Sequence, residues 1–151
     1  CAHSVSPRKK QNRKLSTAFC NNKRMDARRY IVTKAMLQLG FTPGYNGFFF
    51  LRDAVLTTLR DPETLTLITK LIYAPLAKAY GTTSENVEKS IRKAAAAVWK
   101  RHGGTGKTIA VLNSEYRYSD VRPENRELIS LVCHFVEQAG ETFDTDVRSS
   151  V

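Results

Sequence analysis

The stretch from Ile68 to Arg101, ITKLIYAPLAKAYGTTSENVEKSIRKAAAAVWKR, predicts two helices joined by a tight turn. The first helix is expected over Tyr73 to Tyr80. Gly81 ends it, because glycine readily takes the left-handed conformation that follows a helix. The second helix is expected to begin within Thr83 to Glu85, where a hydroxyl side chain can cap its first turn. Three residues of the first helix are expected to face inward: Leu76, Ala77 and Tyr80.

The second helix has two faces of opposite character. Its apolar residues recur at spacings of three and four, which predicts one buried stripe. Long polar side chains occupy the opposite arc and can be laid into a groove, a pattern typical of a recognition helix. The buried stripe consists of Val87, Ile91, Ala94, Ala95 and Val98, and the opposite arc of Glu85, Asn86, Lys89, Arg92, Lys93, Ala96 and Lys100.

The spacing of Leu76, Ala77, Gly81 and Val87 is that of a helix-turn-helix motif. Each residue type has a physical role, since the alanine allows close approach, the glycine makes the turn and the valine wedges the two helices together. A plain helical hairpin with a solvated basic face needs similar residues, so that interpretation stays open at this point.

Composition and charge favour one domain that binds a polyanion. A chain of 151 residues with 42% apolar content is large enough for one hydrophobic core. The net charge is +10, and the first 30 residues carry nine basic side chains against one acidic side chain. We therefore expect a flexible basic arm over residues 1–25, a helix-turn-helix domain over 26–140 and a disordered tail over 141–151. The arm serves either as a linker or as a sequence-independent contact to phosphate.

Several functional classes are disfavoured by the sequence. It has neither an apolar run long enough to span a membrane nor a signal peptide, so we expect a cytoplasmic protein without membrane contact. Cys1, Cys20 and Cys133 are odd in number and lack metal-ligand spacing, which indicates free thiols and no metal site. Cys133 and His134 are adjacent on a predicted helix and point about 100° apart, so they do not form a catalytic pair. We expect no cofactor and no enzyme activity.

The remaining segments predict further helices. Helices are expected over 26–39, 45–60 and 124–139, with Gly140 as the stop of the last one and Arg122 to Asn125 as its cap. The aromatic residues at positions 45 and 48–50 are expected in the core rather than in a ligand pocket. Residues 108–113 fit either a short helix or an extended segment. The sequence GTGKT at 104–108 follows a predicted helix and lacks the first glycine of a phosphate loop, so we expect a mobile connection there.

Residues 27–140 resemble the C-terminal effector domain of the stage 0 sporulation protein A family. The resemblance lies in GYNGFFFLRDAV, in the helix-turn-helix stretch quoted above and in RPENRELISLV. It implies an all-α domain of about six helices that binds double-stranded DNA, often as tandem copies. It also implies contact with RNA polymerase and its sigma factor, and a homodimer on tandem sites. Residues 1–26 are too short for the family's receiver domain, so the chain is either the effector half of a longer protein or a relative without phosphorylation control.

The resemblance also implies which residues read DNA. Lys89 and Asn86 stand where the family typically has arginine, whereas Arg92 keeps the family's type. Asparagine prefers adenine where an arginine fork prefers guanine, so the preferred DNA site is expected to differ. An alternative function is a non-specific RNA-binding or protein-interaction module that uses the basic arm. The expected base and phosphate contacts are Asn86, Glu88, Lys89, Arg92 and Lys93, with Thr82, Thr83 and Ser84 gripping phosphate at the helix N-terminus.

Overall fold

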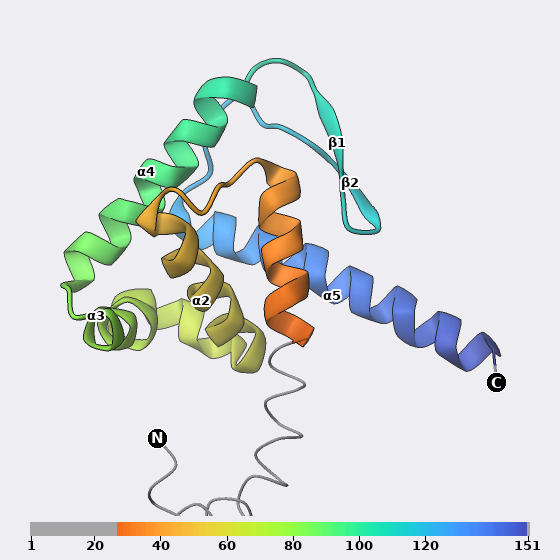
Figure 1. Cartoon of the computed structure of the whole chain (residues 1–151), viewed down its shortest axis with the longest axis horizontal. Helices are drawn as coiled ribbons and strands as arrows, with labels where there is room; N and C mark the ends of the chain where they lie inside the picture. Colours follow the sequence, from red (N-terminus) through yellow and green to blue (C-terminus); the bar gives the residue numbers. More distant parts are fainter. Residues whose placement is uncertain (1–26, 151) are drawn as a thin grey trace, which may run out of the picture.

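A computed structural model describes residues 27–150, and the side chains of residues 27–140 (Figure 1). The expected basic arm at 1–25 lies outside the described residues. A first helix covers 27–39, and the remaining elements follow in chain order. They are α2 (Asn46–Arg60), a 3-10 helix η1 (Pro62–Leu67), a π-helix η2 (Thr69–Tyr73), α3 (Ala74–Tyr80), α4 (Ser84–His102), β1 (Thr108–Val111), β2 (Ser114–Arg117) and α5 (Asn125–Ser150).

The all-α prediction is confirmed, with one small sheet added to the helices. The first helix and α2 both lie within one residue of their predicted bounds. Phe48 and Phe50 are buried as expected, but Tyr45 is 48% exposed, so its assignment to the core was wrong. Tyr45 precedes α2 as its N-cap residue, and its side chain therefore lies at the end of the helix rather than on its buried face.

Helix α2 packs against α4, and the N-terminal end of α2 lies beside the middle of α4 (Figure 1). The approach is closest at Gly47, where an added Cβ would lie 2.7 Å from the backbone carbonyl carbon of Ser90. Only a residue without a Cβ allows the two backbones to come so close. The first half of α4 is thus placed against α2 through main-chain contact.

A β-hairpin occupies the segment that the sequence left undecided. Strands β1 and β2 pair antiparallel, with Thr108 opposite Arg117 and Val111 opposite Ser114. Leu112 at the turn has a φ of 54°, which is uncommon for a residue other than glycine. This turn lacks the Asn-Gly or Asp-Gly signal on which hairpin prediction rests, so the sequence alone gave no indication of the hairpin.

Hydrogen bonds hold the hairpin and the loop that follows it against the helices. The Tyr118 hydroxyl donates to the Leu39 carbonyl oxygen (2.6 Å), and the backbone N–H of Leu112 donates to the Gln38 side chain (2.6 Å). The Trp99 ring N–H donates to the Ser119 hydroxyl (3.2 Å). These contacts connect the hairpin region to both the first helix and the end of α4.

Helix α5 does not stop at Gly140, so the predicted stop was wrong. Gly140 is not among the glycines with positive φ, and without that conformation a glycine does not turn the chain out of a helix. A glycine inside a helix costs only about 1 kcal/mol and is tolerated. The backbone of the expected tail is therefore helical as far as Ser150, while Val151 lies outside the described residues.

No helix in the described part of the chain combines the length and the apolar character that crossing a membrane requires.

Candidate nucleic-acid interface

The turn between α3 and α4 has the geometry that its sequence predicts. Gly81 has φ 68° and ψ 37°, in the left-handed region. The N–H of Thr82 donates to the Ala77 carbonyl oxygen (2.8 Å), which closes the end of α3. Thr83 is the N-cap of α4, and its hydroxyl oxygen accepts from the N–H of Asn86 (3.1 Å). The start of α4 is therefore fixed by local hydrogen bonds on both sides of the turn.

Fewer residues of α3 face the core than the sequence predicted. Leu76 and Ala77 are buried, but Tyr80 is 46% exposed, which corrects its predicted inward position. The Tyr80 ring packs edge-on against Phe50, and its hydroxyl bonds to the Asp53 carboxylate. Partial burial, and then the hydrogen bond to Asp53, raise the pKa of the Tyr80 hydroxyl. Tyr80 thus joins α3 to α2 from the outside of the core.

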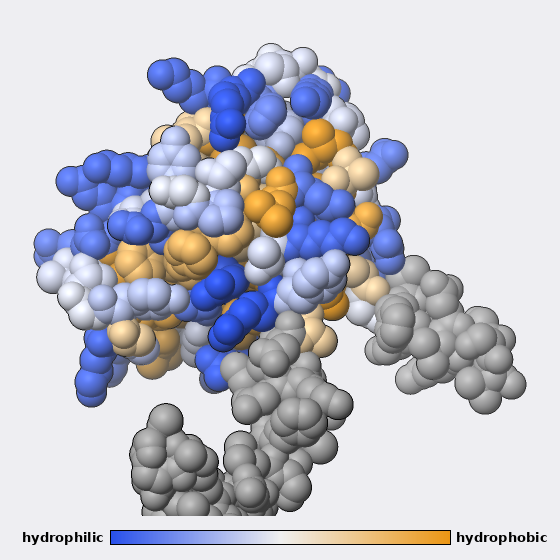
Figure 2. Space-filling view, viewed as in Figure 1, coloured by the Kyte–Doolittle hydropathy of each residue, from blue (hydrophilic) through white to orange (hydrophobic). Residues whose placement is uncertain are grey.

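The two faces of α4 are confirmed. All five residues of the predicted apolar stripe are buried, and Trp99 extends the stripe toward the C-terminal end. The polar arc is exposed, and hydrophilic side chains project along the edge of the molecule that α4 forms (Figure 2). Lys89 and Lys93 lie near the middle of this exposed arc. Within residues 27–140 neither lysine takes part in an ion pair, so both are available to an anionic partner.

Asn86 lies on one flank of the exposed arc and is held there by Thr82. Its side-chain N–H donates to the Thr82 hydroxyl oxygen (2.8 Å) across one turn. Thr82 lies in the turn before α4, and Asn86 lies in the first turn of α4. The structure therefore brings together two residues that the sequence assigned to different tasks, a base contact and a phosphate contact.

Glu88 and Arg92 lie on the other flank, where they form an ion pair of 3.2 Å at i and i+4. About half of the Arg92 side chain remains exposed, at 48%. The backbone carbonyl of Glu88 accepts a hydrogen bond from the Asn125 side chain (3.0 Å). The start of α5 thus anchors this flank of α4 through its backbone and leaves the side chains on the outside.

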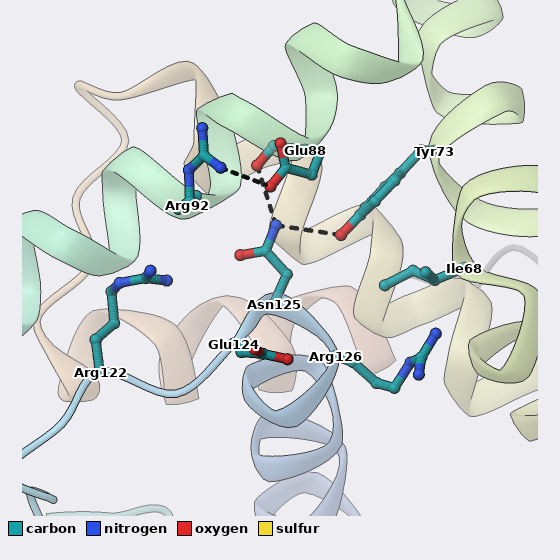
Figure 3. A pocket seen from close by; sticks show the side chains of 8 residues that line it. All are labelled: Ile68, Tyr73, Glu88, Arg92, Arg122, Glu124, Asn125 and Arg126. Carbon is teal, nitrogen blue, oxygen red and sulfur yellow. Dashed lines mark hydrogen bonds and ion pairs between the residues drawn. The ribbon is translucent and has the colours of Figure 1, made fainter.

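A polar pocket of about 410 Å³ opens beside this second flank (Figure 3). Asn125 stands at its centre and also donates to the Tyr73 hydroxyl (3.1 Å). Burial raises the pKa of the Tyr73 hydroxyl, which stays protonated at neutral pH. The lining residues come from η2 and its approach, α4, the loop before α5 and α5 itself: Ile68, Tyr73, Glu88, Arg92, Arg122, Glu124, Asn125 and Arg126.

Arg122 and Arg126 were not among the predicted contact residues. Arg122 was expected only in the cap of the last helix and Arg126 only within that helix. The Asn125 side chain, also expected in the cap, instead turns inward to Tyr73 and Glu88. Two arginines four positions apart beside a helix start were the available signal. Only the fold shows that they stand next to the recognition helix.

The groups considered for other chemistry lie apart from this surface. The Cys133 thiol is buried, and burial raises its pKa to about 12, so it is not a ready nucleophile. His134 is its exposed neighbour on α5. The GTGKT segment follows α4 and leads into β1, with Gly104 and Gly106 at positive φ, so it is a loop between helix and strand.

The fold and this surface define a helix-turn-helix domain whose second helix, α4, carries basic side chains on its exposed face. The model of the family described as "Sporulation initiation factor Spo0A C terminal" matches residues 32–136, and the chain belongs to this family. The resemblance noted from the sequence is thereby confirmed. The family consists of DNA-binding effector domains that act in transcription regulation.

Proposed function

We propose that this chain is a sequence-specific regulator of transcription that lays the outer face of α4 in the major groove of DNA. The observation that carries the proposal is the exposed arc of α4, with Lys89 and Lys93 unpaired at its centre and Asn86 and Arg92 on its flanks. A helix with this arrangement presents donors at the depth of base edges. The buried stripe on its other side fixes which residues face the groove.

The turn before α4 supports a phosphate contact. Thr82, Thr83 and Ser84 surround the N-terminus of a 19-residue helix, where free N–H groups and the helix dipole favour an anion. The Thr83 oxygen already accepts from Asn86, so its hydroxyl hydrogen remains available to a phosphate oxygen. This contact would fix the register of α4 without reading sequence.

Asn86 is proposed to read adenine. Its side-chain nitrogen carries two hydrogens, and the bond to Thr82 uses one of them. The other hydrogen can donate to adenine N7 while the amide oxygen accepts from N6, which is the bidentate pairing of asparagine with adenine. Guanine presents an acceptor at O6 instead, so the same orientation of the amide disfavours it.

Glu88 and Arg92 are proposed to act as a pair. Glu88 holds the Arg92 guanidinium within 3.2 Å on the flank of α4, which limits the directions in which it can reach. A guanidinium reads guanine or binds phosphate, and a carboxylate accepts from cytosine N4. Contact with RNA polymerase and its sigma factor, and a homodimer on tandem sites, complete the proposal on the strength of the family relationship.

The test begins by selecting bound sequences from random duplexes. Fluorescence anisotropy then compares the selected duplex with a scrambled one across a salt series. We expect the unaltered chain to bind the selected duplex at least about tenfold more tightly at physiological salt. In a Lys89→Ala/Arg92→Ala variant this ratio should fall to near one. A Lys34→Ala/Arg60→Ala variant removes the same charge from exposed positions elsewhere and should keep the ratio.

Two outcomes would contradict the proposal. If the unaltered chain binds both duplexes equally and binding disappears with salt, the non-specific alternative is correct. If the ratio survives in the Lys89→Ala/Arg92→Ala variant, sequence is read by a surface other than α4.

A further inference from the structure

Arginines from three different elements line the pocket beside α4, with Arg122 and Arg126 on opposite sides of Asn125 (Figure 3). Arg92 comes from α4, Arg122 from the loop before α5 and Arg126 from α5 (Figure 3). Arg92 is paired with Glu88, and among residues 27–140 neither of the other two arginines takes part in an ion pair. Arg122 donates a long hydrogen bond to the Pro123 carbonyl oxygen (3.3 Å). Glu88 and Glu124 also line the pocket, so three guanidinium groups stand against two carboxylates and the site keeps a net positive charge. A concave site with such an excess favours an anionic occupant.

The position of the pocket relative to α4 limits what that anion can be. On the helix, Asn86 and Arg92 lie on opposite flanks of Lys89, and the pocket opens on the Arg92 side. A helix in the major groove is bordered on each flank by a sugar-phosphate strand. Arg122 and Arg126 therefore stand beyond the edge of the recognition helix, on the side where one of those strands passes.

The floor of the pocket and its rim differ chemically. Asn125 is only 8% exposed, and within the part of the chain whose side chains are described its side-chain oxygen has no hydrogen-bond partner. Its side-chain nitrogen is used twice, by the Tyr73 hydroxyl and the Glu88 carbonyl oxygen, which fixes the oxygen toward the pocket. A carbonyl oxygen repels a phosphate oxygen, so the floor suits a donor such as water or a guanidinium N–H. The anion is thereby kept at the rim, where Arg122 and Arg126 lie.

We propose that this pocket is a second DNA contact, in which Arg122 and Arg126 each bind a backbone phosphate of the same duplex that α4 reads. The proposal rests on the proposed function for the presence of duplex DNA in front of α4. It assigns to α5 a role that the helix-turn-helix does not supply, namely to grip the strand along one flank of the groove. The contact adds affinity and fixes orientation without selecting sequence.

The first experiment measures affinity across a salt series for an Arg122→Ala/Arg126→Ala variant. Loss of two phosphate contacts should lower the magnitude of the slope of log affinity against log salt by about 1.8. Between 50 and 200 mM salt the unaltered chain should then lose about 12-fold more affinity than the variant. The ratio between selected and scrambled duplexes should stay unchanged. The charge-matched Lys34→Ala/Arg60→Ala variant should keep the original slope, and Arg122→Lys/Arg126→Lys should largely restore it.

The second experiment locates the phosphates. Single phosphates along both strands of the bound duplex are replaced by neutral methylphosphonate, one at a time. The unaltered chain should lose affinity at two phosphates flanking the site, and the Arg122→Ala/Arg126→Ala variant should be insensitive to those same replacements. This coupling between a protein charge and a particular phosphate does not arise from a loss of folding.

The outcomes separate this inference from the proposed function. An unchanged salt slope, or methylphosphonate effects that persist in the variant, overturns the phosphate contact even if sequence preference is intact. Equal binding of all duplexes overturns the proposed function, while the slope difference still reports on the two arginines. If inorganic phosphate raises the melting temperature of the unaltered chain but not of the variant, and no methylphosphonate position couples to the arginines, the pocket holds a free anion instead of DNA.

Discussion

The two ends of α4 are held in place by different kinds of contact. At the N-terminal end the neighbouring elements touch its backbone in addition to the buried side chains: Gly47 of α2 packs against the Ser90 carbonyl, and Asn125 bonds to the Glu88 carbonyl oxygen. At the C-terminal end they touch its side chains, since Trp99 and His102 pack against aromatic residues at and after β2. Fixing a helix through its backbone leaves its outer side chains free for a ligand. The proposed DNA-reading half of α4 is the half that is held in this way.

The largest effect should come from the C-terminal end, with Trp99→Ala. The ring is 6% exposed, packs edge-on against Tyr116 and Tyr118 and bonds to Ser119. Removal of a buried tryptophan should lower the free energy of unfolding by about 4 kcal/mol. Chemical denaturation measures the change, and exposed Lys100→Ala serves as the neighbouring control, with an effect within about 0.5 kcal/mol. Similar losses for both variants would show that the aromatic cluster does not hold this end.

The next largest effect should come from the backbone contact at Gly47. In Gly47→Ala the new methyl group would overlap the Ser90 carbonyl, so α2 and α4 must separate. We expect a loss of about 3 kcal/mol in the free energy of unfolding, because the overlapped atoms belong to the main chain and cannot rotate away. Gly44→Ala is the matched control, since its nearest heavy atom is 3.9 Å away. A tolerated Gly47→Ala would mean that the two helices are not in tight contact.

A third prediction concerns the other backbone anchor, Asn125. In Asn125→Ala the Tyr73 hydroxyl and the Glu88 carbonyl oxygen lose their shared donor. We expect a loss of about 2 kcal/mol, because buried polar groups are left without a partner. Ser130→Ala, an exposed change on the same helix, should be close to neutral. If thermal and chemical denaturation show no difference between these variants, α5 does not anchor α4 through Asn125.

The smallest effect should come from Thr82→Val, which changes the exposed surface and leaves both anchors intact. The variant removes the oxygen that orients the Asn86 amide. Preference for adenine over guanine at the contacted position should fall by about 1 kcal/mol, or roughly fivefold, while stability is nearly unchanged. Competition binding with single-base duplexes measures it. As a control, Thr66→Val removes an exposed hydrogen bond of η1 and should leave the preference for adenine unchanged. An equal loss of preference in the Thr66→Val variant would argue against orientation of Asn86 by Thr82.

The elements that could be predicted from the sequence are those with strong local signals. The turn at Gly81 and the start of α4 follow from a glycine, a capping threonine and an apolar period, all within a few residues of each other. The hairpin was missed because Leu112, rather than glycine or asparagine, takes the positive φ in its turn. At Gly140 the error was the opposite one, since a helix end was predicted where α5 continues. A glycine ends a helix in this way only if it takes a positive φ, and Gly140 does not.

The residues of the candidate site also differ in whether local sequence signals could predict them. Helical period alone places Asn86, Lys89 and Arg92 on the exposed arc of α4, because residues three and four apart share a face. The pairing of Asn86 with Thr82 follows from a spacing of four residues across the turn. Nothing in the sequence relates Arg122 to α4, since it is 30 positions from Arg92 and reaches the pocket through the packing of α5.

The sequence by itself determined the helix-turn-helix, the two faces of its second helix and the excess of positive charge, because each depends on interactions between near neighbours in the chain. The tertiary structure decided what stands beside that helix: the glycine contact beneath it, the aromatic cluster at its end and the arginine-lined pocket on its flank. These depend on how distant segments pack, and packing is set by the shape of the whole core rather than by any local pattern.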